Sequence, residues 1–246
     1  MKIVRAHAWA ETVELLRYPA FVIPTIGFPA LFFLFFGRAG SAAGAGAGAG
    51  ASMASFAAFA VFGVVFFQFG VGIAQERSAP WQLFLRVLPV APWQRLVGRL
   101  CSAVLFAAAS AGVVVAVALG RSTVAVGGFG WLRLAVALAA GAVPFGLLGI
   151  ALGYLLSPKA ALPIANLVYL GLSYFGGLWT GPDGLHGVAR TVSPYLPTRH
   201  WSDLVVGAVG DGPWQTVPVL WLAGYAGAFA VLARFAYRRD EARHFA

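Results

Sequence analysis

The chain alternates long apolar runs with short polar segments. A helix needs roughly 20 apolar residues to cross the hydrocarbon core of a bilayer, and six of the runs are long enough to do so. Membrane-spanning helices are therefore expected at residues 19–37, 53–74, 96–119, 131–156, 160–179 and 217–236. The pattern predicts an all-α membrane protein that forms one transmembrane domain over residues 1–246.

Residues 1–18 precede the first apolar run and mix charged with apolar side chains. Trp9, Val13 and Leu16 recur at the helical spacing i, i+4 and i+7, which predicts an amphipathic helix lying in the membrane interface. A secretory signal peptide would begin with a short, positively charged region, whereas this segment is long and carries two glutamates. The run at 19–37 is therefore interpreted as an uncleaved span.

The segment between the second and third runs, residues 75–95, is both charged and patterned. Ser78 is a candidate helix cap and Pro89 a helix stop, and Arg86 projects away from the apolar face. That face is formed by Trp81, Phe84, Leu85 and Leu88. The pattern predicts a short amphipathic helix at the membrane surface. The alternative is a basic loop that only fixes the orientation of the chain.

Two other connecting segments are long. Residues 37–52 form an Ala/Gly tract, which predicts a flexible loop. Residues 180–216 are too polar to cross the bilayer but carry apolar patches at 185–192 and 204–209. We therefore expect residues 180–216 to form an outer re-entrant segment, made of two short helices that dip into the outer leaflet.

Composition and charge support a membrane protein and indicate its orientation. A chain that is 60% hydrophobic and 10% charged, with a mean hydropathy of +0.82, is no ordinary soluble domain. Its formal net charge of +9 favours anionic lipid headgroups over nucleic acid, because the basic residues cluster between the spans. Twelve of the 17 basic residues lie on the side that holds both termini and residues 75–95; the others are Arg38, Arg121, Arg133, Arg190 and Arg199. We therefore expect a multi-pass protein of the bacterial cell (inner or plasma) membrane with both termini in the cytoplasm.

The sequence offers no catalytic residues and no metal site. The expected spans contain no Asp, Glu or His, which argues against an ion-coupled carrier and an intramembrane enzyme, and their few polar groups include Gln68 and Asn166. His200 and Asp203 are too few to form a metal site. No lysine stands in a glycine-rich phosphate loop, so the chain is not expected to bind ATP. Cys101 is expected to be a small buried residue.

The loop at 75–95 resembles the intracellular loop of type-2 ABC exporter permeases of the drug-export-like branch, the membrane subunits of ATP-driven exporters. The matching residues are Glu76, Arg77, Leu83, Arg86, Val87 and Pro89. The sequence departs from the family at 78–80, where an acidic residue and Gly-Thr usually follow the Glu-Arg pair. A looser match in the outer segment consists of Gly176, Gly177, Pro182 and Pro197, with a departure at 184–186.

The resemblance implies one permease domain with an interfacial helix, six transmembrane helices, a cytoplasmic coupling helix and an outer re-entrant segment. It implies as partners two ABC ATPase subunits, a second permease copy or a similar permease, and membrane lipid, with no nucleic acid. ATP and magnesium would bind the ATPase, and this chain would carry no cofactor. Residues expected to couple the chain to the ATPase are Glu76, Arg77, Trp81, Phe84, Leu85 and Arg86.

The function expected from the resemblance is export of a small apolar or amphipathic compound, either drug-like or lipid. Phenylalanines in the first and second spans could hold varied apolar ligands by contact area. The candidate substrate path consists of Phe59, Phe66, Gln68 and Asn166. The alternatives are export of a polysaccharide or lipid-linked glycan by the same machinery, a secondary carrier or channel, and a membrane-embedded enzyme with its chemistry in the outer segment.

Overall fold

The structure, a computed structural model, describes residues 9, 12–13, 15–17, 19–37, 47–78, 92–121, 124, 126–210 and 212–244. Within these ranges the chain consists of helices and turns, without strands. The longer helices are α2 (Pro19–Phe36), α3 (Ala47–Arg77), α5 (Pro92–Arg121), α6 (Gly128–Leu155), α7 (Pro158–Phe175), α9 (Pro197–Val209) and α10 (Thr216–His244). The short ones are η1 (Pro182–Gly184), α8 (Val188–Val192) and η2 (Ser193–Tyr195). The prediction of an all-helical protein is confirmed.

Helices occupy all six segments expected to span the membrane. Within the described residues, four of them are long and apolar enough to cross a bilayer: Gly48–Arg77, Val97–Arg121, Gly128–Leu155 and Thr216–Ala242. A shorter apolar helix runs over Val22–Phe36, and the expected fifth span corresponds to α7, which has 18 residues. The chain is therefore a helical membrane protein with several apolar helices.

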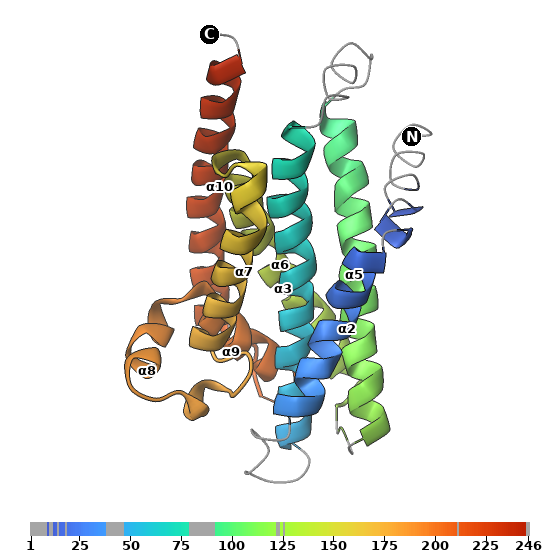
Figure 1. The fold of residues 1–246 in the computed structure, drawn as a ribbon. Helices are drawn as coiled ribbons and strands as arrows, with labels where there is room; N and C mark the ends of the chain where they lie inside the picture. The colour runs from blue at the N-terminus through green and yellow to red at the C-terminus, as the bar shows by residue number, and fades with distance from the viewer. Residues whose placement is uncertain are drawn as a thin grey trace.

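The helices form a bundle with α3 at its centre (Figure 1). Helix α3 packs against α2, α5, α6, α7 and α9, while α10 packs on α6 and α9. The C-terminal ends of α3 and α10 lie at one end of the bundle, at the top of Figure 1, and α8 and α9 lie at the other. Helix α2 crosses in front of α3 and α5.

Glycines let α3 and α6 approach backbone to backbone. A Cβ on Gly149 would lie 3.0 Å from the Phe66 carbonyl oxygen, and one on Gly153 would lie 2.8 Å from that of Phe69. Gly70 of α3 faces Gly149 directly. Small residues four apart are a known means of close packing between membrane helices. The Gly149-x-x-x-Gly153 spacing in the sequence is thus explained by helix packing.

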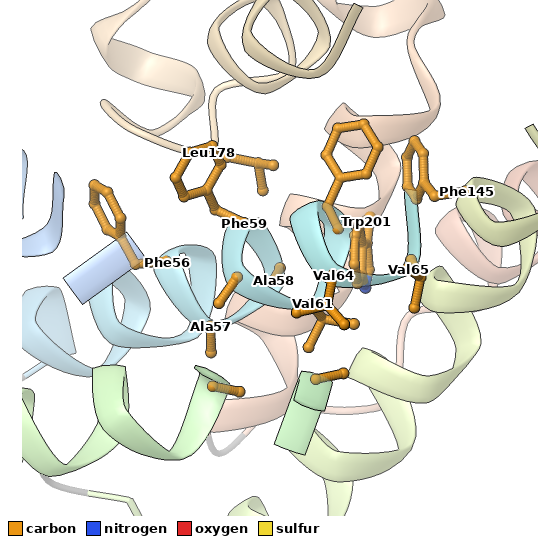
Figure 2. Close-up of a cluster of buried hydrophobic side chains, with 14 of the residues drawn as sticks. Phe56, Ala57, Ala58, Phe59, Val61, Val64, Val65, Phe145, Leu178 and Trp201 are labelled. Atoms are coloured by element: carbon orange, nitrogen blue, oxygen red, sulfur yellow. The ribbon is translucent and has the colours of Figure 1, made fainter. Parts of the chain in front are cut away.

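The side chain of Trp201 fixes helix α9 in the bundle. Trp201 is fully buried, its Nε1 donates a hydrogen bond to the carbonyl oxygen of Ala137 at 2.9 Å, and its ring stacks on Phe145. Figure 2 shows Trp201 beside Phe145 and the valines of α3. On α6 the ring occupies the space above Gly141. At 13 residues, or about 20 Å, α9 is too short to cross a bilayer.

Helix α9 also carries the two residues weighed as metal ligands, His200 and Asp203. His200 stacks on Trp221 at 4.9 Å, and Asp203 pairs with Arg199 at 3.0 Å. Burial lowers the pKa of His200, while the nearby Asp203 carboxylate opposes this shift. No group of three or more potential metal ligands occurs in the part of the chain that the structure describes.

The structure corrects three expectations. Helix α3 begins at Ala47, so residues 47–52 of the expected loop are helical; alanine favours helix, and Gly50 packs near Val126 and Val209. Cys101 is exposed on α5, because its position on the helix points away from the core. At the other end of α3, the helix runs on to Arg77, three residues beyond the expected span. Most of the expected interfacial helix at 1–18 lies outside the described residues.

The Trp201 contact yields a stability prediction. The change Gly141→Ala places a Cβ about 2.0 Å from the Trp201 ring, so α6 or α9 must move. We expect a loss of stability of about 1–3 kcal/mol, the usual cost of overpacking, seen as a lower midpoint of thermal unfolding in detergent. Gly227→Ala is the matched control, because nothing lies within 4 Å of its Cβ position. Equal unfolding midpoints for the two variants would contradict the close contact between Trp201 and Gly141.

Candidate functional site: a groove beside α3 and the ion pairs at its end

A groove of about 530 Å³ opens between α2, α3, α5 and α7. Its wall is mainly aromatic and aliphatic. The aromatic residues are Phe28 and Phe32 of α2, Phe59 and Phe67 of α3, and Tyr169 of α7. The volume lies in the range of pockets that hold small molecules, about 300–1,000 Å³. The groove is therefore large enough for a drug-sized or lipid-like ligand.

Contacts between α3 and α7 fix the back of the groove. The rings of Phe59 and Tyr169 stack with their centroids 4.7 Å apart, and the Tyr169 hydroxyl donates to the Phe59 carbonyl oxygen at 3.0 Å. Gly63 makes room for that hydroxyl, because a Cβ there would lie 2.9 Å from it. On the other side, Phe32 meets Phe59 at 5.5 Å. This aromatic wall is thus held in place by three helices.

A proline explains how α2 is joined to α5. Pro29 has no backbone N–H, so the Thr25 carbonyl oxygen four residues earlier has no helical donor. Ser110 of α5 donates its hydroxyl to this oxygen at 2.9 Å. In a membrane, where water is absent, such replacement bonds allow proline inside a helix. The bond anchors the front wall of the groove.

The two amides expected from the sequence, Gln68 and Asn166, both line the groove. Gln68 of α3 is 4% exposed and donates from Nε2 to the Ser102 hydroxyl at 2.9 Å. Asn166 of α7 is exposed and donates from Nδ2 to the Leu162 carbonyl oxygen at 3.1 Å. Each amide therefore uses one N–H of its NH2 group on the protein itself.

An ion pair lies at the end of the groove where α3 ends. Glu76 pairs with Arg99, and both line the groove. The Arg99 side chain is 11% exposed and that of Glu76 is 44% exposed. The Glu76 side chain is therefore the more exposed partner of the pair.

The neighbouring residue, Arg77, points to the other side of α3. It pairs with Asp240 of α10, donates from Nη2 to the Leu156 carbonyl oxygen at 2.8 Å, and lies over the Tyr154 ring at 5.7 Å. A cation at the C-terminal end of a helix bonds carbonyls that lack helical partners. Arg77 thus joins the ends of α3, α6 and α10.

The structure brings most of the described site residues expected from the sequence to one side of α3. Phe59, Gln68 and Asn166 line the groove together with Glu76. Phe66 does not line it and is fully buried, because its stretch of α3 faces Gly149 of α6. Arg77 belongs to α3 and makes contacts on the side away from the groove. Trp81, Phe84, Leu85 and Arg86 lie outside the described residues.

Other residues of the site were missed in the sequence. Arg99 and Asp240 form the ion pairs, and Tyr169 forms the back of the groove. The sequence shows that residues 95–99 are basic. It does not show that Arg99 pairs with Glu76, because two residues joined by a connecting loop have no fixed sequence spacing. Asp240 lies 163 residues from Arg77, so no local pattern could have paired them.

A bundle of apolar helices around such a groove, with its charges at one end, is the architecture of a membrane transport subunit. The chain belongs to the ABC-2 family: the model described as "ABC-2 family transporter protein" matches residues 43–235. It is also 25% identical over 248 residues to "Putative transport permease YvfS" of Bacillus subtilis (strain 168), covering 98% of this chain and 100% of that protein. The resemblance to type-2 ABC permeases is thereby confirmed. The chain is a membrane subunit of an ABC transporter, which implies an ABC ATPase as its partner.

The Arg77–Asp240 pair yields a second prediction. Arg77→Ala and Asp240→Ala should each destabilise the protein by about 1–3 kcal/mol, because each leaves a half-buried charge without its partner. The double variant should lose less than the sum of the two, measured by thermal unfolding. Arg199→Ala and Asp203→Ala form the control cycle, because an i, i+4 pair within one helix is worth only about 0.3–0.5 kcal/mol. Additive losses at Arg77 and Asp240 would contradict the pairing.

Proposed function

We propose that the chain is the permease of an exporter that moves a small apolar or amphipathic compound, drug-like or lipid, out of the cell. The observation that carries this proposal is the aromatic groove beside α3. Aromatic walls hold varied apolar ligands by area, with little directional bonding. A hydrated polysaccharide would need a polar path, whereas the wall of this groove is mainly apolar.

We further propose six spans, with both termini and the 75–95 loop in the cytoplasm of a bacterial cell membrane. The N-terminal segment would lie in the membrane interface, and the segment from η1 to α9 would be the outer re-entrant part. Two observations support this arrangement. The ends of α3 and α10 lie together, at the end opposite α9 (Figure 1), and basic residues predominate on that side of the sequence.

Coupling to ATP hydrolysis would pass through the loop that follows Arg77. A separate ABC ATPase, present in two copies, would bind ATP and magnesium and receive Trp81, Phe84 and Leu85, with Arg86 beside them. The ion pairs of Glu76 and Arg77 support this role, because they tie the start of the loop to α5, α6 and α10. A push on the loop would then move several helices together.

A second permease, either identical or similar, would complete the transporter. Helix α7 supports this proposal because its buried residues form one narrow stripe: Ala161, Ala165, Tyr169 and Ser173. Beside that stripe Leu162 and Leu170 line the groove and remain exposed. A partner placed there would close the groove on its open side.

The function is tested on the complex of this chain with its partner ATPase in lipid vesicles. ATP hydrolysis should rise when hydrophobic drugs or lipids are added. Trp81→Ala should remove this stimulation, because the loop loses its largest apolar contact. Trp214→Ala is the matched control, since Trp214 lies between α9 and α10 at the other end of the bundle.

Two results would contradict the proposed function. One is stimulation only by a polysaccharide or its lipid-linked precursor, which would favour glycan export. The other is full stimulation in Trp81→Ala, which would remove the loop from the coupling pathway.

The proposed orientation is tested with single cysteines in a Cys101→Ser background. Ser78→Cys and Gly212→Cys both replace exposed residues, at opposite ends of the bundle. In intact cells an impermeant maleimide should label position 212, and position 78 should react only after permeabilisation. The opposite pattern would reverse the orientation, and equal labelling of both positions in intact cells would reject it.

A further inference from the structure

Gln68 carries a buried hydrogen-bond acceptor that nothing in the described chain satisfies. Its Nε2 is bound to Ser102, but its Oε1 has no hydrogen-bond partner among the described residues. Leaving such an atom unpaired in an apolar site is unfavourable, because it has lost its bond to water and gained none in return. Because Gln68 lines the groove, a ligand that brings an N–H or O–H group would relieve this cost.

Two other residues of the groove also offer hydrogen-bond acceptors. Asn166 uses one N–H of its Nδ2 on Leu162, and its Oδ1 is an acceptor. The Tyr169 hydroxyl donates a hydrogen bond to the Phe59 carbonyl oxygen, so its own oxygen can only accept another. Among the described atoms that line the groove, the buried polar atom without a partner is Gln68 Oε1, which is an acceptor. The groove thus favours a ligand that donates a hydrogen bond to this atom.

Charge adds a second preference. Glu76 stands about 12 Å along α3 from Gln68, two helical turns away, and its carboxylate is the more exposed partner of the ion pair with Arg99. The pair as a whole is neutral, but its carboxylate is more accessible than its guanidinium. Aromatic rings, which form the wall, also attract cations through their faces.

We propose that the groove binds a cationic amphiphile with a protonated amine, whose N–H groups donate to Gln68 Oε1 and Asn166 Oδ1 while its apolar part lies on the aromatic wall. Glu76 attracts the positive head at the mouth. An anionic amphiphile of the same size meets carbonyl oxygens and a carboxylate instead. This inference rests on the proposed function and names the substrate class for the same groove.

The test is direct binding to the purified full chain in nanodiscs of zwitterionic lipid, with empty nanodiscs subtracted. Three radiolabelled probes share one alkyl chain: dodecylamine, dodecyltrimethylammonium and dodecanoate. Dodecylamine should bind most tightly, because it has both the charge and the N–H donors. Dodecyltrimethylammonium, which has the charge alone, should bind more weakly, and dodecanoate should bind most weakly.

Variants separate the hydrogen bonds from the charge. Gln68→Leu should weaken dodecylamine binding about tenfold, as expected for a hydrogen bond to a charged donor, and leave dodecyltrimethylammonium nearly unchanged. Asn166→Leu should act in the same direction, and because Asn166 is exposed it also serves if Gln68→Leu does not fold. Glu76→Gln should weaken the binding of both cationic probes. Gln215→Leu alters an exposed position outside the groove and serves as the control. It should leave the binding of all three probes unchanged.

Equal binding of the three probes would overturn the proposal, as would amine binding that neither Gln68→Leu nor Asn166→Leu alters. Because no ATPase is present, this result is independent of the test of function. Amine binding without stimulated ATP hydrolysis would support the proposed amine site and contradict the proposed export function. Drug-stimulated hydrolysis together with equal binding of the three probes would support the export function and contradict the amine site.

Discussion

The close approach of α3 and α6 is the contact on which the rest of the bundle depends. Lipid tails are as apolar as leucine, so helices in a membrane gain little by burying apolar side chains against one another. Dispersion between tightly packed backbones must hold them instead. Gly149 and Gly153 provide that packing by letting α6 meet the carbonyl groups of α3 directly. With one side of α3 fixed on α6, its opposite side is left to form the groove.

The rotation of α3 then determines what its last residues contact. Successive residues of a helix point about 100° apart, so Glu76 and Arg77 cannot face the same neighbour. Glu76 meets Arg99 at the groove, and Arg77 meets Asp240 on the other side. Glu76 and Arg77 look like one polar motif in the sequence. In the structure they form two separate ion pairs that bind α3 to different helices. Together they hold the end of α3 between α5 and α10.

The sequence predicted the helices well and their tertiary contacts less well. Apolar runs gave the positions of the helices, because hydropathy reports burial in lipid directly. The helix ends were missed: α10 extends to His244, beyond the expected end at residue 236, and includes Asp240, which pairs with Arg77. Likewise α9 begins at Pro197, since Trp201 packs against Gly141 of α6. Such ends depend on partners distant in the sequence, which no local pattern contains.

The candidate site shows the same limit. Phe59 and Phe66 are seven residues apart on α3 and look equivalent in the sequence, yet only Phe59 lines the groove. Seven residues bring a helix back to within about 20° of the same direction, so periodicity alone places both on one face. They differ because Tyr169 of α7 stacks on Phe59, whereas Phe66 lies against α6. Identifying the groove therefore requires the positions of α2 and α7.

The packing also determines which wall of the groove can move at least cost. A shift of α3 would break its glycine contacts with α6 and strain both ion pairs at its end. Helix α7 is held to α3 by a single buried stripe and by the hydrogen bond from Tyr169 to Phe59. A change in groove width therefore costs less when α7 moves against a fixed α3 than when α3 itself moves. Such a motion would strain the bond from Tyr169 to Phe59, which lies beside the aromatic wall that an apolar ligand would touch.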